Sequence, residues 1–219
     1  MSYLKEKATA FLMSRIGKTA RVITTENITD SLLAITLHTP DLAKWRSCQH
    51  LKFETGKGHY RDYTLAHWNE ANKQGTLLID AGHEGAGSNW ARLLRPGQAL
   101  LYAGPGGGIH QPTAAAHLVC LGDASAIGHF SSLFHRKGTQ QQLYTLISHK
   151  QPLPLKILDM PVDTTAGYIA GVERWLLQQP FPMSDTTFYV AGNIPLVVQI
   201  RKLIKRLGAQ QIKAQGFWE

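Results

Sequence analysis

The stretch HLVCLGDASAIG, residues 117–128, marks the point at which the pattern of the sequence changes. It begins with an apolar run and ends in glycine, aspartate and small residues, as a buried strand followed by a helix would. Two later stretches, QLYTLIS (142–148) and TFYVAGN (187–193), are apolar runs of the same kind. Strands buried on both faces have this continuous character, and strands that alternate with helices form parallel sheets. We therefore predict an α/β domain with a parallel sheet over residues 113–219.

The sequence before this stretch has a different rhythm. Six short segments alternate apolar and polar residues between polar or glycine-bearing turns: ARVITTE (20–26), LLAITLH (32–38), HLKF (50–53), YRDYTLAH (60–67), TLLIDAG (76–82) and ALLYAG (99–104). Alternation at period two with close spacing predicts an antiparallel β-barrel. We expect this domain to occupy residues 1–112, with a helical segment over about residues 1–17 and a Gly- and Pro-rich seam at residues 105–115.

Composition is that of an ordinary soluble protein. Of 219 residues, 43% are hydrophobic and 17% are charged, and no apolar run approaches the roughly 20 residues that cross a bilayer. Lys5, Glu6 and Lys7 stand where the apolar core of a signal peptide would begin. Cys48 and Cys120 form no C-x-x-C pattern, which favours reduced thiols. We expect a cytoplasmic monomer that is not an integral membrane protein.

The formal net charge of +8 is compatible with nucleic acid, an anionic surface or small anionic ligands as partners. The densest basic patch, IRKLIKRLG at residues 200–208, has apolar residues at helical spacing and is explained as the solvated face of an amphipathic helix. Neither interleaved aromatics nor zinc-finger spacing supports nucleic-acid binding. The ten histidines are scattered without metal-ligand spacing, so we expect no resident metal.

A glycine-rich corner, HEGAGSNWARLLRPG at residues 83–97, is the first candidate site. Ser88 is expected to be the N-cap of a short helix, NWARLLR at residues 89–95. Because Gly85 and Gly87 have no side chains, a ligand can approach the backbone just before this helix. Free N–H groups at a helix N-terminus bind anions, so a phosphate is the expected guest. A tight turn with a capping serine and no ligand is the alternative.

The second candidate is the strand YRDYTL at residues 60–65. Alternation places Arg61 and Tyr63 on one face and Thr64 on the other. An arginine, an aromatic ring and a hydroxyl could hold a diphosphate, a flat ring and a ring nitrogen, although an ordinary strand also produces such a pattern.

Five motifs together resemble one family. In chain order they are CQHLK (48–52), RDYT (61–64), HEGAGSNWARLLRPGQ (83–98) followed by GPGG (104–107), CLGDASAIG (120–128) and GFW (216–218). This set resembles the siderophore-interacting proteins, the NAD(P)H-dependent ferric siderophore reductases among the ferredoxin-reductase-like flavoproteins. The likeness runs from about residue 18 to the end of the chain. It implies an FAD-binding barrel, an NAD(P)H-binding α/β domain, and electron transfer from NAD(P)H through FAD to Fe(III), with release of Fe(II).

The resemblance also implies residue roles for FAD. Arg61 would pair with the diphosphate, Tyr63 would lie against the flavin or ribityl chain, and Thr64 would approach N5. The phosphates would be bound at Gly87, Ser88 and Asn89 by backbone N–H groups and the serine hydroxyl. His83 would approach the adenine half or cap a turn, whereas Trp90 is expected in the core.

For NAD(P)H, Asp123 and Ser125 would lie beside the nicotinamide or its ribose, at the carboxyl end of the first parallel strand. Asn193 closes another strand at the same edge and is also expected to be the N-cap of the basic helix. His149 and Lys150 follow a parallel strand and could receive a 2′-phosphate, which favours NADPH over NADH.

The substrate implied by the resemblance is a ferric siderophore. A catecholate is favoured, because Lys52 is expected near the exposed flavin edge and Lys213 and Trp218 of the second domain could close a basic pocket. No protein side chain is required as a catalytic acid or base. The alternatives are a flavin-dependent reductase of another acceptor and a siderophore-binding module without turnover.

The sequence also departs from the family pattern. Ala66 stands where the family usually has a second arginine, and His67 is the candidate to replace its contact. Cys48 precedes Gln49 in place of glycine.

Overall fold

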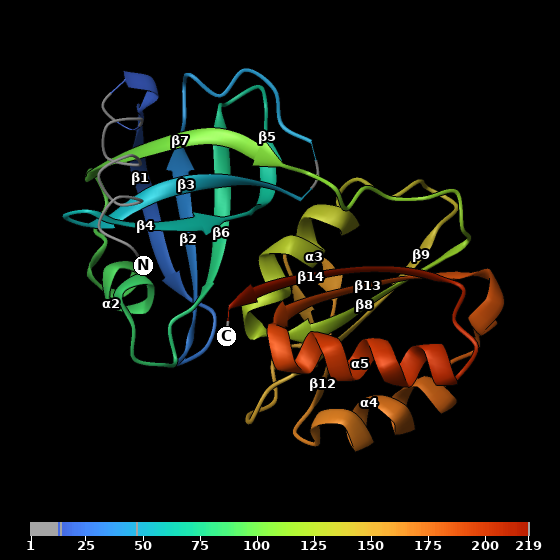
Figure 1. Cartoon of the computed structure of the whole chain (residues 1–219). Coiled ribbons are helices and arrows are strands. Elements are labelled where there is room, and N and C mark those ends of the chain that lie inside the picture. The colour runs from blue at the N-terminus through green and yellow to red at the C-terminus, as the bar shows by residue number, and fades with distance from the viewer. Residues whose placement is uncertain (1–12, 14, 47, 219) are drawn as a thin grey trace. The chain divides into compact units, whose positions relative to one another are not determined.

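The computed structural model describes residues 13, 15–46 and 48–218 (Figure 1). The chain divides into two compact units, residues 1–109 and 110–219. Of the predicted N-terminal helical segment, Met13, Arg15 and Ile16 are helical, and residues 1–12 and 14 lie outside the described residues. Among the described residues, no helix is both long enough and apolar enough to cross a bilayer.

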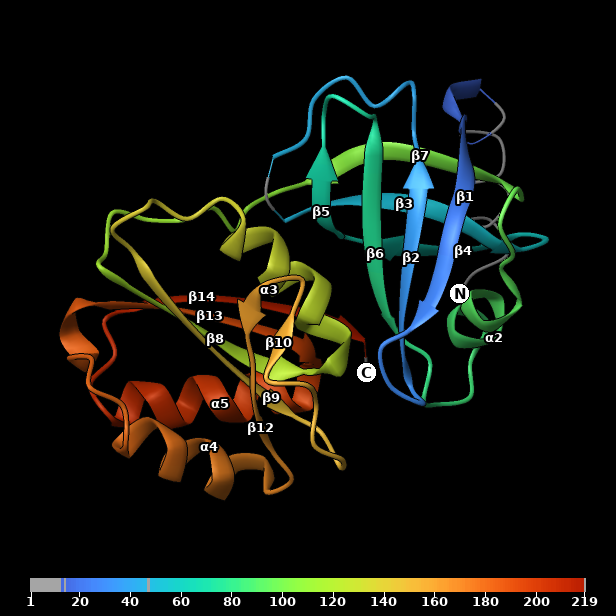
Figure 2. The ribbon, with the colours of Figure 1, turned by 180° about the vertical axis from the view of Figure 1, so that it is seen from behind.

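The first unit is built on an antiparallel sheet, against which a helix packs. Its strands are β1 (Lys18–Asn27), β2 (Leu32–His38), β3 (Gln49–Gly56), β4 (His59–Tyr63), β5 (Leu65–Asn69), β6 (Gln74–Asp80) and β7 (Ala99–Gly107), and its helix is α2 (Ala86–Leu93). The strand order is β4-β3-β7-β1-β2-β6-β5. Because only Thr64 separates the two edge strands β4 and β5, the sheet curls round on itself (Figures 1 and 2). The predicted antiparallel barrel is confirmed.

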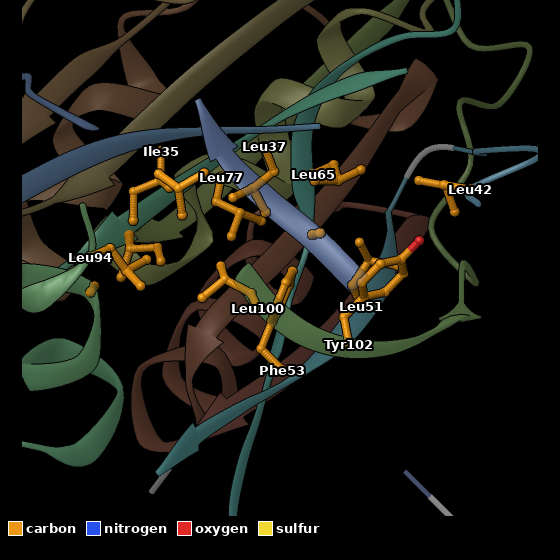
Figure 3. Packing of buried hydrophobic residues seen from close by; sticks show 14 of the residues in the cluster. Ile35, Leu37, Leu42, Leu51, Phe53, Leu65, Leu77, Leu94, Leu100 and Tyr102 are labelled. Atoms are coloured by element: carbon orange, nitrogen blue, oxygen red, sulfur yellow. The ribbon is translucent and has the colours of Figure 1, made fainter. Parts of the chain in front are cut away.

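The interior of this barrel is apolar (Figure 3). Alternation along β3 turns Leu51 and Phe53 inward, where both are fully buried beside Tyr102 of β7. Ala91 of α2 and Leu94 just after it belong to the same cluster, and Trp90 packs against it. The helix is therefore held to the barrel by its apolar side, and Trp90 is partly buried against the core that was predicted to contain it.

The second unit is an α/β sheet. Its strands are β8 (His117–Asp123), β9 (Gln142–Ser148), β12 (Asp163–Thr165), β13 (Thr186–Asn193) and β14 (Gln211–Trp218); its elements also include η1 (Ala124–Ala126), α3 (Ile127–Phe134), the pair β10 (Lys156–Ile157) and β11 (Met160–Pro161), α4 (Tyr168–Leu177), η2 (Met183–Asp185) and α5 (Ile194–Arg206). The five strands pair in parallel in the order β12-β9-β8-β13-β14. Helix α3 covers one face of the sheet, and α4 and α5 cover the other (Figures 1 and 2). The predicted parallel α/β sheet is confirmed.

Candidate functional site

The glycine-rich corner starts its helix earlier than predicted. Helix α2 begins at Ala86, and Gly85, in extended conformation, is its N-cap without a side-chain hydrogen bond. The prediction that Ser88 is the N-cap is wrong. Ser88 lies in the first turn with its side chain buried, and its hydroxyl is 2.9 Å from Nδ1 of His83. A small residue suits this buried position, and the hydroxyl stabilises the corner from inside.

The backbone N–H groups of the first turn are those of Ala86, Gly87 and Ser88. Within the part of the chain that the structure describes, none of the three donates a hydrogen bond, as is usual for a helix N-terminus. Asn89 differs, because its N–H donates to the Gly85 carbonyl at 2.9 Å. The prediction that the Asn89 amide is available to a phosphate is therefore wrong. Ala86, which sequence reasoning missed, supplies the third amide.

The R-x-Y-T strand meets this helix start at Gly87. A Cβ added at Gly87 would lie 2.5 Å from the Tyr63 hydroxyl and 3.6 Å from Cγ of Arg61. The Arg61 guanidinium is exposed and donates to the Tyr60 carbonyl at 2.8 Å. The structure thus brings together Arg61, Tyr63 and the first-turn amides, which are more than 20 residues apart in the chain. A cation and several backbone donors around a residue without a side chain are the groups that bind phosphate.

Aromatic packing fixes the orientation of Tyr63. Its ring stacks on Trp90 at 5.6 Å between centroids and 12° between planes, and Phe53 lies at 6.2 Å. Burial raises the pKa of Tyr63 to about 12, although the nearby charge of Arg61 acts in the opposite direction. The hydroxyl therefore remains a neutral group that can donate a hydrogen bond at physiological pH.

His83 lies on the exposed side of the corner. Its Nδ1 faces the Ser88 hydroxyl and also lies 3.4 Å from the Glu84 carbonyl oxygen. These contacts fit the expected role of His83 in capping the turn, and its approach to the adenine half of FAD stays a prediction.

The opposite face of the β3–β4 pair carries Lys52. Cross-strand register pairs Lys52 with Asp62, between the pairs Leu51–Tyr63 and Phe53–Arg61. Alternation therefore puts Lys52 on the side where Thr64 follows β4, and not on the side of Arg61 and Tyr63. The Lys52 ammonium forms an ion pair with Asp62 at 2.7 Å. Asp62 is a charged neighbour that sequence reasoning missed.

The position of the missing second arginine is buried. Ala66 is fully buried in β5, where it presents no polar group, and His67 is exposed beside it. The structure thus leaves His67 as the polar side chain at this point of the strand.

In the second unit, the strand order reverses direction between β8 and β13. In chain order the sheet reads 3-2-1-4-5, and nucleotides bind at the carboxyl ends of the strands where such a sheet reverses. Asp123 ends β8 at this point. Its carboxylate accepts hydrogen bonds from the N–H groups of Asn193 at 2.6 Å and Ser125 at 2.9 Å. Gly192 has a φ of +125°, and a Cβ there would lie 2.6 Å from the Asp123 carboxylate. Asp123 therefore joins the two strand ends.

Asn193 caps helix α5. Its side-chain oxygen accepts a hydrogen bond from the N–H of Leu196 at 3.3 Å, so the predicted N-cap is confirmed. Because this oxygen is used to cap the helix, any contact of Asn193 with a ligand would be made by its side-chain NH2 group or its backbone carbonyl.

Trp218 reaches the same edge of the sheet. On β14 it is paired in register with Asn193, and its indole N–H donates to the Ser125 hydroxyl at 3.1 Å. The structure therefore places Trp218 with the residues predicted to bind NAD(P)H, whereas the sequence assigned it to the substrate.

His149 and Lys150 follow β9 at this carboxyl edge. The N–H of His149 donates to the Thr165 carbonyl at 3.0 Å, and its Nδ1 lies 2.9 Å from the Gln151 carbonyl oxygen. The Lys150 side chain is exposed. Both residues lie one strand away from Asp123, since β9 pairs with β8.

Lys213 belongs to an internal polar cluster of the second unit. Its ammonium donates to the Gln111 carbonyl at 3.3 Å and lies 5.7 Å from the centre of the Tyr189 ring. The same cluster contains a pair of buried histidines, His110 and His129, whose Nδ1 and Nε2 atoms are 2.8 Å apart. The described residues contain no group of three histidine, cysteine or acidic side chains placed to bind a metal ion.

The histidine pair predicts a pH dependence of stability. Burial, and second the charge of Lys213, lowers the pKa of His110 to about 4, and burial lowers that of His129 well below its usual range. In the unfolded chain a histidine binds a proton near pH 6.5, so between about pH 6.5 and pH 4 the unfolded chain binds more protons than the folded chain. The free energy of unfolding therefore decreases as the pH is lowered through this range. We expect the protonation of His110 in the unfolded chain to lower the free energy of unfolding by about 2 kcal/mol when the pH is lowered from 7 to 5.

Urea unfolding of the wild type and of His110→Gln at several pH values measures this effect. The variant should have the shallower dependence on pH, because one titrating group has been removed. Identical slopes would show that His110 does not carry the effect.

Comparisons with known proteins bear on the fold. No protein-family model and no curated protein sequence matches the chain. A siderophore utilization protein from T. fusca superposes with a TM-score of 0.75 and 21% identity, over 93% of this chain and 92% of that one. A siderophore-interacting protein from Aeromonas hydrophila gives 0.71 and 19%, over 93% and 91%. The ferredoxin reductase of a carbazole 1,9a-dioxygenase gives 0.77 and 19%, over 92% and 69%.

The chain has the fold of these proteins. The proteins from T. fusca and Aeromonas hydrophila match it over nearly their whole length, whereas the ferredoxin reductase is longer than the matched part. The antiparallel barrel followed by the five-stranded parallel sheet is the shared architecture.

Proposed function

We propose that this protein is a flavin-dependent reductase that uses NAD(P)H to reduce Fe(III) in a siderophore. The observation that carries the proposal is the meeting of Arg61, Tyr63 and the first turn of α2 around Gly87. The fold shared with siderophore-interacting proteins supports it. One NAD(P)H supplies two electrons, so it reduces two Fe(III) to two Fe(II) and releases one proton.

The first unit is proposed to bind FAD. Arg61 would pair with the diphosphate while the N–H groups of Ala86, Gly87 and Ser88 bind its oxygens. Tyr63, held by Trp90, would support the ring system or the ribityl chain, and the Thr64 hydroxyl would orient the flavin from the other face of the strand. Bound FAD supplies the conversion of a two-electron hydride donor into single electrons for iron.

The second unit is proposed to bind NAD(P)H at the carboxyl ends of β8 and β13. Asp123 holds the two strand ends at a fixed separation, so that Ser125 and the backbone can contact the nicotinamide half. The Trp218 indole, hydrogen-bonded to Ser125, covers this position. His149 and Lys150 are proposed to receive the 2′-phosphate of NADPH.

Lys150→Glu should reverse or remove a preference for NADPH. A lysine attracts the 2′-phosphate, whereas a carboxylate repels it and can accept hydrogen bonds from the ribose hydroxyls of NADH. We expect the ratio of kcat/KM for NADPH to that for NADH to fall by roughly tenfold, or about 1.4 kcal/mol.

Lys202→Glu is the matched control, because it makes the same charge change on the exposed side of α5. Equal kcat/KM values for the two nucleotides, unchanged in Lys150→Glu, would contradict the assignment.

The acceptor is proposed to be a ferric siderophore, with Lys52 attracting an anionic catecholate chelate. Lys213 remains a second proposed contact, although its ammonium already binds the Gln111 carbonyl. The shared fold also supports a second candidate, a reductase whose acceptor is a protein, because a ferredoxin reductase has the same architecture.

An anaerobic assay with FAD, NADPH and a ferric siderophore tests the proposal. Fe(II) is measured as its coloured complex with a ferrous-specific chelator, and ferricyanide serves as a general electron acceptor. Efficient reduction of the siderophore complex supports the proposal. Rapid reduction of ferricyanide without reduction of any ferric siderophore would favour the protein-acceptor alternative.

A further inference from the structure

The ion pair between Lys52 and Asp62 lies in the middle of the β3–β4 pair. The two residues are direct cross-strand partners, their charged atoms are 2.7 Å apart, and their side chains are 36% and 45% exposed. Because each side chain leaves a strand with fixed register, neither can turn to the other face of the sheet. Asp62 therefore stays beside Lys52 on the side where Thr64 follows.

This geometry changes what an approaching anion meets. A lone ammonium attracts an anion over a Debye length of about 8 Å at physiological salt. An ammonium with a carboxylate at contact distance acts as a small dipole, whose attraction decreases much faster with distance. An anionic chelate must then either compete with Asp62 for Lys52 or approach the carboxylate itself at a cost on the order of 1 kcal/mol in water. A neutral chelate meets neither effect.

We infer that Asp62 is a specificity-determining residue for the electron acceptor, because it weakens the attraction of Lys52 for anionic iron chelates and leaves neutral chelates unaffected. This inference rests on the proposed function, and it concerns the charge of the acceptor and not the chemistry of electron transfer. Asp62 acts in part through Lys52, as a positioning residue, and in part through its own charge.

Asp62→Asn tests the inference, because it removes the charge and keeps the shape of the side chain. The kcat/KM is measured with saturating NADPH for a multiply anionic ferric tris-catecholate and for a neutral ferric tris-hydroxamate. We expect a rise of roughly three- to tenfold for the catecholate and less than about twofold for the hydroxamate. The rise should shrink when the ionic strength is increased, since both charges are partly exposed.

Two further variants isolate the mechanism. Glu70→Gln removes the same charge from an exposed position in the turn between β5 and β6, and it should change the kcat/KM for neither acceptor. Adding Lys52→Met to Asp62→Asn should remove most of the gain for the catecholate, because the released ammonium is then absent. If the effect of Asp62 were purely structural, the kcat/KM values for both acceptors would change equally, and the change would not depend on ionic strength.

Equal changes for the two chelates, or no change for either, in a variant that binds FAD and is reduced by NADPH as the wild type is, would overturn the inference about Asp62 alone. Failure of the wild type to reduce any ferric chelate would overturn both this inference and the proposed function.

Discussion

Gly87→Ala is expected to purify with little or no FAD. The added Cβ would lie 2.5 Å from the Tyr63 hydroxyl, and Tyr63 cannot simply turn away because its ring is stacked on Trp90 and contacts Phe53. Either the tyrosine or the start of α2 must move, and the methyl group also occupies the space beside the first-turn amides. We expect FAD affinity to fall by at least about tenfold, which corresponds to 1.4 kcal/mol.

The measurement is a fluorescence or calorimetric titration of the FAD-free protein with FAD. Gly56→Ala is the matched control, because a Cβ at Gly56 meets only ordinary contacts, the nearest at 3.7 Å. Wild-type affinity in Gly87→Ala would show that the corner is a tight turn without a ligand.

Arg61→Ala should weaken FAD binding for a different reason. The guanidinium is exposed, and among the described residues its hydrogen bond is to the adjacent Tyr60 carbonyl in its own strand. Its removal therefore costs the barrel little. A charge-assisted contact with a diphosphate is worth about 1.5–3 kcal/mol, so we expect a loss of roughly ten- to a hundredfold in FAD affinity.

Comparison with FMN separates this role from a general loss of structure. FMN lacks the second phosphate and the adenosine, so Arg61→Ala should weaken FMN binding less than FAD binding. Arg21→Ala, on β1 at another part of the barrel, is the control. Full FAD occupancy in purified Arg61→Ala would contradict the assignment of Arg61.

The two sheet types could be predicted from the sequence because each has its own local pattern. Alternating segments such as LLAITLH form antiparallel strands with one face in the barrel, and continuous runs such as TFYVAGN form parallel strands that are covered on both sides. The capping of α5 was also predictable, since Asn193 directly precedes the apolar periodicity of that helix.

The start of α2 was not predictable from capping preference. Serine is a good N-cap, but Gly85 and Gly87 leave the backbone free to begin the helix before Ser88. As a result, the Asn89 N–H donates to the Gly85 carbonyl, and the amide of Ala86 takes its place among the first-turn donors.

Other features depend on contacts between distant parts of the chain. The partner of Lys52 follows from the register of β3 with β4, which no local pattern specifies. The pair of His110 and His129 needs α3 in place on its sheet. Lys213 was expected to be available to a substrate, but its position on β14 brings it against Tyr189 and the Gln111 carbonyl.

The absorption spectrum of the purified protein, reconstituted with FAD and titrated without oxygen, tests the central proposal most directly. We predict a yellow protein whose flavin absorption is bleached by NADPH and returns when a ferric siderophore is added, with two Fe(II) formed for each NADPH consumed. A protein that binds no FAD, or whose bound FAD is not reduced by NADPH or NADH, would contradict the proposal.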